Sequence, residues 1–271
     1  MNLSSLLIPE ASIGLMAFSC AMGVAIPLVF FIWFRWRGAD ISPFFVGCAV
    51  MLLFAFILEA GAHAFVFRSA AAPALEGNIW LYALYGGLMA GIFEESGRFV
   101  AFKTVLRKRR ENDRNALMYG AGHGGFEALM VLTVGMAANL MLAAVVNSGQ
   151  GASLVAGLPA DLAAQVEQSL MLLAATRPAE YLLGVAERLI AVTLHVALSV
   201  LVWFAAKSPG RLWLFPAAIA LHAAVDALAV ILPFLAVAPA IIELVFAAAT
   251  AVVGFLSWSV WRRESVPAVH L

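Results

Sequence analysis

Residues 11–34 read ASIGLMAFSCAMGVAIPLVFFIWF, a run that contains no charged side chain. About 20 apolar residues in a helix cross the hydrocarbon core of a bilayer, so this stretch predicts a membrane-spanning helix. Further long apolar runs follow at residues 41–67, 78–102, 115–146, 180–206, 211–231 and 234–261. The pattern predicts an all-α, polytopic transmembrane helical bundle of about seven spans that forms a single integral membrane domain over residues 1–271.

The composition of the whole chain excludes several classes of protein. Of its 271 residues, 64% are hydrophobic and 12% are charged, whereas a soluble domain is about half apolar and about a quarter charged. A water-soluble enzyme and a disordered chain are therefore excluded. A membrane β-barrel would show alternating segments of about ten residues instead. No basic stretch interleaved with aromatic residues indicates a nucleic-acid partner, so the expected surroundings are the lipid bilayer.

The distribution of lysine and arginine predicts the orientation of the chain in the membrane. With the N-terminus outside, the outer segments hold only Arg68 and Arg177, and Arg98 and Arg188 lie within spans. The cytoplasmic segments then hold the other basic residues: Arg35, Arg37, Lys103, Arg107, Lys108, Arg109, Arg110, Arg114, Lys207, Arg211, Arg262 and Arg263. Positive charge accumulates on the cytoplasmic side of membrane proteins, which predicts an N-out, C-in topology.

The longest loop, residues 147–179, lies on the outer side in this topology. Within it, Pro159 and Asp161 precede a helical apolar stripe at Leu162, Val166 and Leu170, which is a pattern that begins a helix. We expect an outer-side helix over about residues 160–175, either lying in the membrane interface or packed as a cap over the bundle.

The predicted spans contain many ionisable residues, and such groups are costly at bilayer depth and mark functional sites. Counting along the spans at about 1.5 Å per residue places Glu94, His123, His195 and His222 roughly 12–17 Å below the cytoplasmic surface. Four helices would therefore bring a glutamate pair and three histidines to one level. The full set is Glu59, His63, Glu94, Glu95, Arg98, His123, Glu127, Glu187, Arg188, His195, His222, Asp226 and Glu243.

Residues four positions apart share a helix face, and three such pairs occur at this level. They are Glu94 with Arg98, His123 with Glu127, and His222 with Asp226. In the two histidine pairs the acid can orient the imidazole, although each pair also fits a structural ion pair or hydrogen bond. Glycines at positions 120, 122, 124 and 125 surround His123, and small residues allow close helix approach. Glu59 and His63 fall nearer the outer side and fit a structural or entrance-lining role.

A carboxylate beside neutral imidazoles in a low-dielectric cavity suits the activation of water. Burial and a second carboxylate shift one glutamate towards a useful general base. Imidazoles or a bound metal ion can stabilise the oxyanion that forms on a scissile carbonyl. No HExxH motif occurs, so a standard zinc-protease helix is absent, whereas a metal site assembled from several helices stays open.

These motifs resemble the YhfC-type intramembrane proteases, which are related to the CaaX prenyl proteases and the PrsW proteases. The resemblance rests on EESGR at 94–98, YGAGHGGFE at 119–127, His195 and HAAVD at 222–226. The CaaX group carries EExxxR, FxxxH and HxxxN/D in the same order. Here the arginine comes one residue earlier, and Tyr119 replaces the phenylalanine. In the PrsW motifs EExxK and FxxxE, Arg98 takes the place of the lysine and Glu127 that of the glutamate.

The resemblance implies a bundle with a membrane-embedded cavity that opens to the cytoplasmic side. It assigns Glu94 or Glu95 as general base, His123 as a group that positions water, and His222 as the oxyanion donor. The supporting residues would be Arg98, Tyr119, Glu127, His195 and Asp226. A metal such as zinc, if present, would be held among Glu94, His123, His195 and His222.

The sequence therefore predicts an intramembrane endopeptidase of a bacterial plasma (inner) membrane that hydrolyses a membrane-associated peptide or protein. The proposed chemistry is glutamic-type or metal-assisted, through a Glu-activated water in a cytoplasmic-half cavity. Two alternatives stay open: a proton- or divalent-metal-coupled transporter, because buried carboxylates and histidines also line such paths, and a non-catalytic membrane scaffold.

Overall fold

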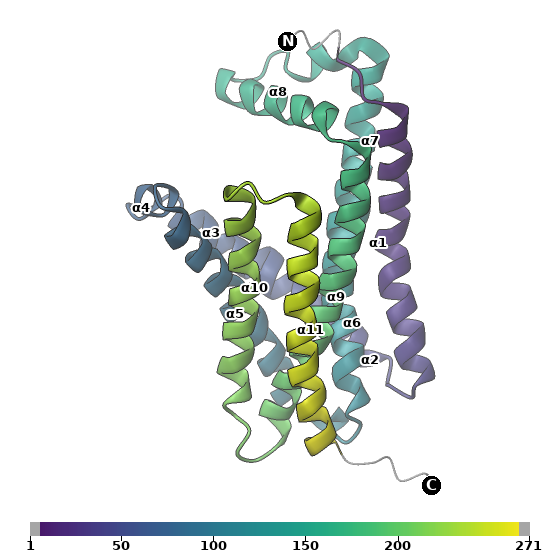
Figure 1. Ribbon diagram of the computed structural model, residues 1–271, viewed down its shortest axis with the longest axis vertical. Coiled ribbons are helices and arrows are strands. Elements are labelled where there is room, and N and C mark those ends of the chain that lie inside the picture. The colour runs from purple at the N-terminus through teal and green to yellow at the C-terminus, as the bar shows by residue number, and fades with distance from the viewer. Residues whose placement is uncertain (1–5, 266–271) are drawn as a thin grey trace. The chain divides into compact units, whose positions relative to one another are not determined.

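The computed structural model describes residues 6–265, and this part of the chain is helical without a β-strand (Figure 1). The helices form two compact units. Within the described residues, unit 1 comprises residues 6–25 and 128–186, and unit 2 comprises residues 26–127 and 187–265. All the residues of the predicted site belong to unit 2. The all-α class expected from the sequence is confirmed.

Six helical stretches are long and apolar enough to cross a membrane. The helix at the predicted third span, α5 (Ile79–Lys103), has 25 residues but is not among the six, and it carries Glu94, Glu95 and Arg98. The predicted bundle of about seven spans thus corresponds to these six stretches and α5. The six are residues 10–36, 42–66, 114–154, 178–207, 214–234 and 239–264.

Unit 1 contains the first part of α1 (Glu10–Trp36), the π-helical turn η4 (Leu129–Val134), α7 (Gly135–Val145), the short turns η5 (Val146–Gln150) and η6 (Gly151–Leu154), α8 (Ala160–Ala175) and the start of α9 (Pro178–Lys207). Helix α8 occupies the segment for which the sequence predicts an outer-side helix. Asn147 joins this unit to its N-terminal segment, because its amide accepts a hydrogen bond from the Ile8 N–H at 2.8 Å and donates one to the Ile8 carbonyl at 2.9 Å.

Unit 2 holds the rest of α1 and α9 together with the remaining elements. These are α2 (Ser42–Met51), the π-helical η2 (Leu52–Glu59), α3 (Ala60–Val66), α4 (Ala72–Glu76), α5, η3 (Arg107–Arg109), α6 (Arg114–Ala128), α10 (Leu214–Phe234) and α11 (Pro239–Glu264). The start of α5 is fixed by Asn78, whose side chain accepts from the N–H groups of Trp80 and Leu81, as an N-cap residue does. Proline at the first position begins α11.

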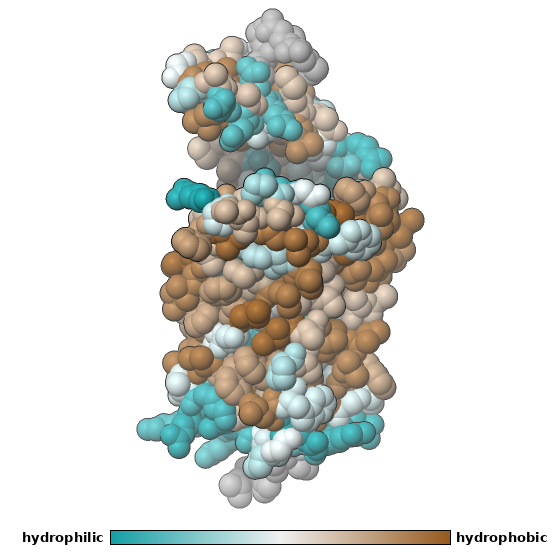
Figure 2. All heavy atoms as spheres, turned by 90° about the vertical axis from the view of Figure 1, so that its left-hand side faces the viewer, coloured by the Kyte–Doolittle hydropathy of each residue, from teal (hydrophilic) through white to brown (hydrophobic). Residues whose placement is uncertain are grey.

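The surface of unit 2 suits a lipid environment. Exposed apolar side chains such as Leu84, Leu88 and Ile92 lie along α5, and Figure 2 shows a broad hydrophobic band across one face of the unit, with hydrophilic side chains at its end. Inside, the apolar core gathers where the C-terminal halves of α5 and α9 meet the first turns of α6 and α10, around Phe102, Tyr119 and Trp203. This core lies at the end of unit 2 that carries the basic residues Arg107 to Arg110, Lys207 and Arg211.

Candidate active site

The centre of the polar network is a group of three side chains from α5, α6 and α9. His123 Nε2 lies 2.9 Å from Glu94 Oε2, and His195 Nδ1 lies 3.8 Å from the same oxygen. Each residue offers one atom that can bind a metal, an imidazole nitrogen or a carboxylate oxygen, and these three atoms lie within 4.8 Å of one another. All three residues are buried. The sequence prediction that spans 3, 4 and 5 bring a glutamate and two histidines together therefore agrees with the geometry.

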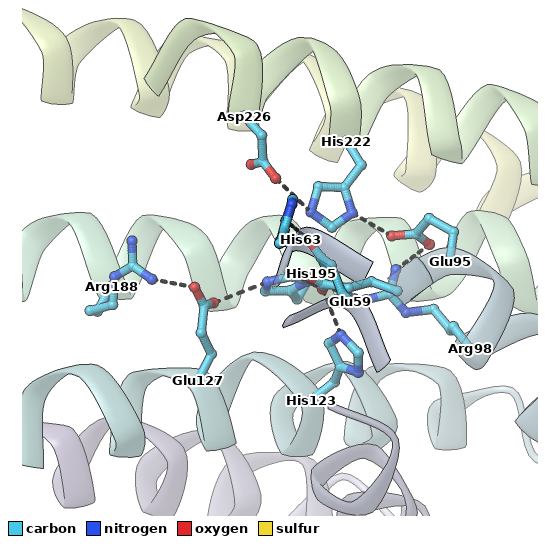
Figure 3. A network of polar contacts seen from close by, with 11 residues as sticks. Glu59, His63, Glu95, Arg98, His123, Glu127, Arg188, His195, His222 and Asp226 are labelled. Carbon is cyan, nitrogen blue, oxygen red and sulfur yellow. Dashed lines mark hydrogen bonds and ion pairs between the residues drawn. The ribbon is translucent and has the colours of Figure 1, made fainter. Parts of the chain in front are cut away.

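A second group surrounds His222 of α10 (Figure 3). Its Nδ1 lies 2.7 Å from Glu95 Oε1, and its Nε2 lies 3.4 Å from Asp226 Oδ2. Arg98 forms an ion pair with the other oxygen of Glu95 and donates a hydrogen bond to His195 Nδ1 at 3.2 Å. The His222 and His195 rings are adjacent, with centroids 5.4 Å apart. Arg98 thus links the two groups, and His222 is held between two carboxylates.

Glu127 of α6 fixes the far side of His195. One of its oxygens accepts from His195 Nε2 at 3.2 Å, and the other pairs with Arg188 of α9. Arg188 also pairs with Glu187, the residue before it. A carboxylate that accepts from one imidazole nitrogen sets the tautomer and orientation of the ring. Glu127 therefore presents His195 Nδ1 towards Glu94.

Close helix contacts made by glycine hold these side chains together. A Cβ atom on Gly124 would lie 2.9 Å from His195 Cδ2, so α6 and α9 meet without a side chain between them at this point. A Cβ atom on Gly87 would lie 2.2 Å from the Ala223 carbonyl oxygen, which shows that α5 and α10 are equally close. Small residues permit such backbone approach in membrane helices. The glycines beside His123 thus serve helix packing, as the sequence predicts.

A cavity of about 100 Å³ adjoins the site. Its wall includes Glu94, His195, His222 and Asp226, together with Phe246 and Thr250 of α11. The volume has room for several water molecules. The Asp226 and Glu187 side chains, which also line it, are 37% exposed, so the cavity is accessible at that end.

The cavity lies on the side of the site away from the basic end of unit 2. Towards the basic end, the space beyond the site is filled by the buried side chains of Phe102, Tyr119, Trp203 and Phe204. The ring of Tyr119 stacks on His123 with centroids 5.7 Å apart. The opening to the cytoplasmic side that the resemblance implies stays a prediction.

Of the three pairs predicted within a helix, two do not form, and their members have other partners. His123 contacts Glu94 rather than Glu127, and Glu127 contacts Arg188 and His195. Arg98 pairs with Glu95, three residues away, rather than with Glu94. Only the pair between His222 and Asp226 forms as expected. His123 and Glu127 find closer partners on neighbouring helices, and Arg98 finds a closer partner three residues earlier in its own helix.

Glu59 and His63 pair with each other beside this centre, and two further residues of the site carry little or no signal in the sequence. Glu59 contacts His63 at 3.2 Å, and His63 contacts Tyr85 at 2.9 Å, which fits the structural interpretation of that pair. Arg188 was not assigned to the site, although a charge within a predicted span was the available signal. Thr250 carries no signal that distinguishes it from other threonines in apolar helices.

The donor set at Glu94, His123 and His195 fits a divalent metal ion. Two imidazoles and one carboxylate are the ligands of many catalytic zinc sites, and the Glu127 carboxylate behind His195 supplies the outer hydrogen bond that such ligands have. A cation bound there would replace Arg98 as the partner of His195 Nδ1. His222, the fourth metal candidate from the sequence, does not belong to this group, because both of its nitrogens face carboxylates.

Comparison with known proteins identifies relatives over most of the chain. Residues 22–246 match the sequence profile of the family described as YhfC intramembrane metalloprotease. A Bacillus subtilis (strain 168) protein described as uncharacterized membrane protein YhfC is 32% identical over 224 residues, which is 80% of this chain and 83% of that protein. No solved structure matches. The family match covers the polar network around Glu94 and His222, whereas Thr250 of the cavity wall lies beyond it.

Proposed function

The chain belongs to the YhfC intramembrane metalloprotease family, and from that premise we propose that it is an endopeptidase that hydrolyses a membrane-embedded peptide or protein at the cavity beside Glu94. The observation that carries the proposal is the buried group of Glu94, His123 and His195 on the wall of a cavity. The apolar helices and the membrane-protein relative make it an integral membrane protein; we further assign it to a bacterial inner membrane.

Glu94 is the general base in this proposal, and Glu95 is not. Both contacts of the Glu94 carboxylate with His123 and His195 use Oε2, which leaves Oε1 to accept a proton from an attacking water. Glu95 is fully buried, and its two oxygens are taken by Arg98 and His222. Glu95 therefore positions His222, whereas Glu94 faces the cavity.

His222 stabilises the oxyanion of the tetrahedral intermediate. Its ring is on the cavity wall and is oriented by Glu95 on one nitrogen, while the other nitrogen faces Asp226 and the cavity. A preorganised donor of this kind in a low-dielectric site contributes about 2.7–4 kcal/mol to catalysis.

A divalent metal ion would be held by Glu94, His123 and His195, with zinc as the first candidate. When bound, it would polarise the scissile carbonyl and lower the pKa of water. The protein residues in turn orient these ligands: Glu127 holds His195, and the stacked ring of Tyr119 packs on His123.

The test uses the purified full-length protein in detergent or nanodiscs with a panel of labelled single-span peptides. We expect Glu94→Gln to reduce cleavage by at least about a hundredfold, the lower range for removal of a general base. The matched control is Glu180→Gln, a glutamate that pairs with Arg177 and does not line the cavity; this variant should keep full activity. Cleavage by Glu94→Gln at the parent rate would refute the role of Glu94.

The metal is tested by its content in the purified protein and by the effect of its removal on cleavage. We expect about one equivalent of zinc or another divalent ion per chain by elemental analysis of the purified protein, and its loss in a His123→Ala variant. A chelator should abolish cleavage, and added zinc should restore it. A protein that cleaves peptide fully without bound metal would leave Glu94 as base and remove the metal from the mechanism.

A further inference from the structure

Helix α11 forms one wall of the cavity, and no residue of this wall has a role in the hydrolysis proposed above. Phe246 and Thr250 of α11 line the same cavity as Glu94, His195 and His222. The two residues are four positions apart, so they project from one face of the helix. This face of α11 therefore looks across the cavity towards the proposed catalytic groups.

Thr250 is buried without a partner. It is 5% exposed, and its Oγ1 makes no hydrogen bond to any residue from 6 to 265. Threonine in a helix commonly satisfies its hydroxyl at the carbonyl four residues earlier, as Thr193 does at Leu189 O at 2.8 Å. A buried hydroxyl that forgoes this bond carries a desolvation cost, and here it lies on the wall of a cavity.

The other polar side chains on the cavity wall are paired with one another. Each has a hydrogen bond or an ion pair within the described part of the chain, and only the Thr250 side chain lacks one. On the α11 wall of the cavity, Thr250 therefore offers a hydroxyl that no other residue of the described chain occupies.

The chemistry of an intramembrane substrate matches this hydroxyl. A membrane helix must unwind locally before its peptide bond can be attacked, and each freed N–H and C=O group then needs a partner because the hydrocarbon offers none. A threonine hydroxyl both donates and accepts, so it can satisfy either group. The apolar ring of Phe246, one turn away, offers a surface to a neighbouring apolar side chain.

We propose that Thr250 hydrogen-bonds a backbone peptide group in an unwound stretch of a membrane-embedded polypeptide, and that Phe246 contacts the adjacent apolar side chain. The proposal rests on the proposed function and deepens it, because it names the wall that holds the substrate. Thr250 is a substrate-binding residue in this scheme and takes no part in proton transfer.

The experiment measures binding apart from hydrolysis. Full-length protein with Glu94→Gln in nanodiscs is titrated with a fluorescently labelled single-span peptide of about 22 apolar residues that has a central Gly-Gly to ease unwinding. Loss of one neutral hydrogen bond corresponds to about a three- to tenfold change in Kd. We expect Thr250→Val to weaken binding by that factor, whereas Thr250→Ser, which keeps the hydroxyl, stays within about twofold of the parent.

The matched control is Thr193→Val, since Thr193 satisfies its hydroxyl within its own helix and does not line the cavity; its Kd should be unchanged. Thermal unfolding of Thr250→Val should occur at or above the parent temperature, because the variant removes an unpaired buried hydroxyl. An unchanged Kd in Thr250→Val, equal weakening in Thr250→Ser, or absence of saturable peptide binding would each overturn the proposal. Binding that depends on Thr250 without any cleavage by the wild-type protein would uphold it and reject the hydrolase function.

Discussion

Gly124 is the position where a single added methyl group would disturb the site most directly. A Cβ atom there would lie 2.9 Å from His195 Cδ2 and 3.0 Å from Val192 Cα. Carbon atoms in favourable contact are about 3.5–4.0 Å apart, so Gly124→Ala requires α6 and α9 to separate by roughly 0.5–1 Å at this point. One of the atoms that must move belongs to the backbone of α9, and side-chain rotation alone cannot relieve the contact.

The displacement falls on His195, which is held from two sides. Glu127 accepts from its Nε2 and Arg98 donates to its Nδ1, so the ring cannot turn away without breaking one of these bonds. A misplacement of about 1 Å can reduce catalysis about a hundredfold. We therefore expect Gly124→Ala to lower kcat/KM by about ten- to a hundredfold and to reduce bound metal. Overpacking costs about 1–3 kcal/mol of stability.

The assay compares peptide cleavage, metal content and thermal unfolding of the purified variant with those of Gly254→Ala. Gly254 lies in α11 with no atom within 4 Å of a Cβ built there, so the same substitution should leave activity unchanged and stabilise the helix by up to about 1 kcal/mol. If Gly124→Ala retains wild-type activity and metal content, the close contact of α6 with α9 does not position His195, and the reasoning is refuted.

Three further predictions concern two charges of the site and one buried charge at the basic end of unit 2. Glu127→Gln should lower metal affinity by about 10- to 100-fold in a metal titration, because the outer hydrogen bond to His195 weakens; unchanged affinity would contradict the metal assignment of His195. Arg98→Lys should reduce kcat/KM by about tenfold, since an ammonium group cannot span Glu95 and His195 as the guanidinium does, and wild-type kinetics would show that the bridge is dispensable. Asp113→Ala should lower the free energy of unfolding by about 1–3 kcal/mol by leaving Trp203 Nε1 without its acceptor, while activity per folded molecule stays unchanged; equal stability would show that this buried bond contributes nothing.

The fold and the composition of the site follow from simple physical rules applied to the sequence. The cost of burying charge in a bilayer identifies Glu94, His123, His195 and His222 as exceptional residues, and helical rise brings them to one level. These two rules need only the number of residues between a charged side chain and the end of its span. The structure joins Glu94, His123 and His195 in one group and places the His222 ring next to that of His195.

The pairing of the side chains could not be predicted in the same way. The spacing of four residues joins His123 to Glu127 along α6, yet the structure joins His123 to Glu94 and Glu127 to Arg188. Which partner wins depends on the rotation of each helix about its axis and on close contacts such as that at Gly87. The spacing of residues within one segment determines neither helix rotation nor the contacts between helices. For the same reason, the sequence does not predict that Thr250 lies on the cavity wall.

The apolar core next to the site favours a hydrolase over a transporter. A proton or metal transporter needs polar or water-filled passage on both sides of its binding site. Here Tyr119 covers His123, and Phe102 and Trp203 pack edge-on beyond it, with ring centroids 4.6 Å and 5.0 Å apart along the series. These rings are fully buried. Aromatic packing closes the site along this line, whereas Asp226 and Glu187 leave the cavity accessible on the other side. This asymmetry favours the proposed hydrolysis, which needs access for a substrate and water from one side, over a continuous path for an ion.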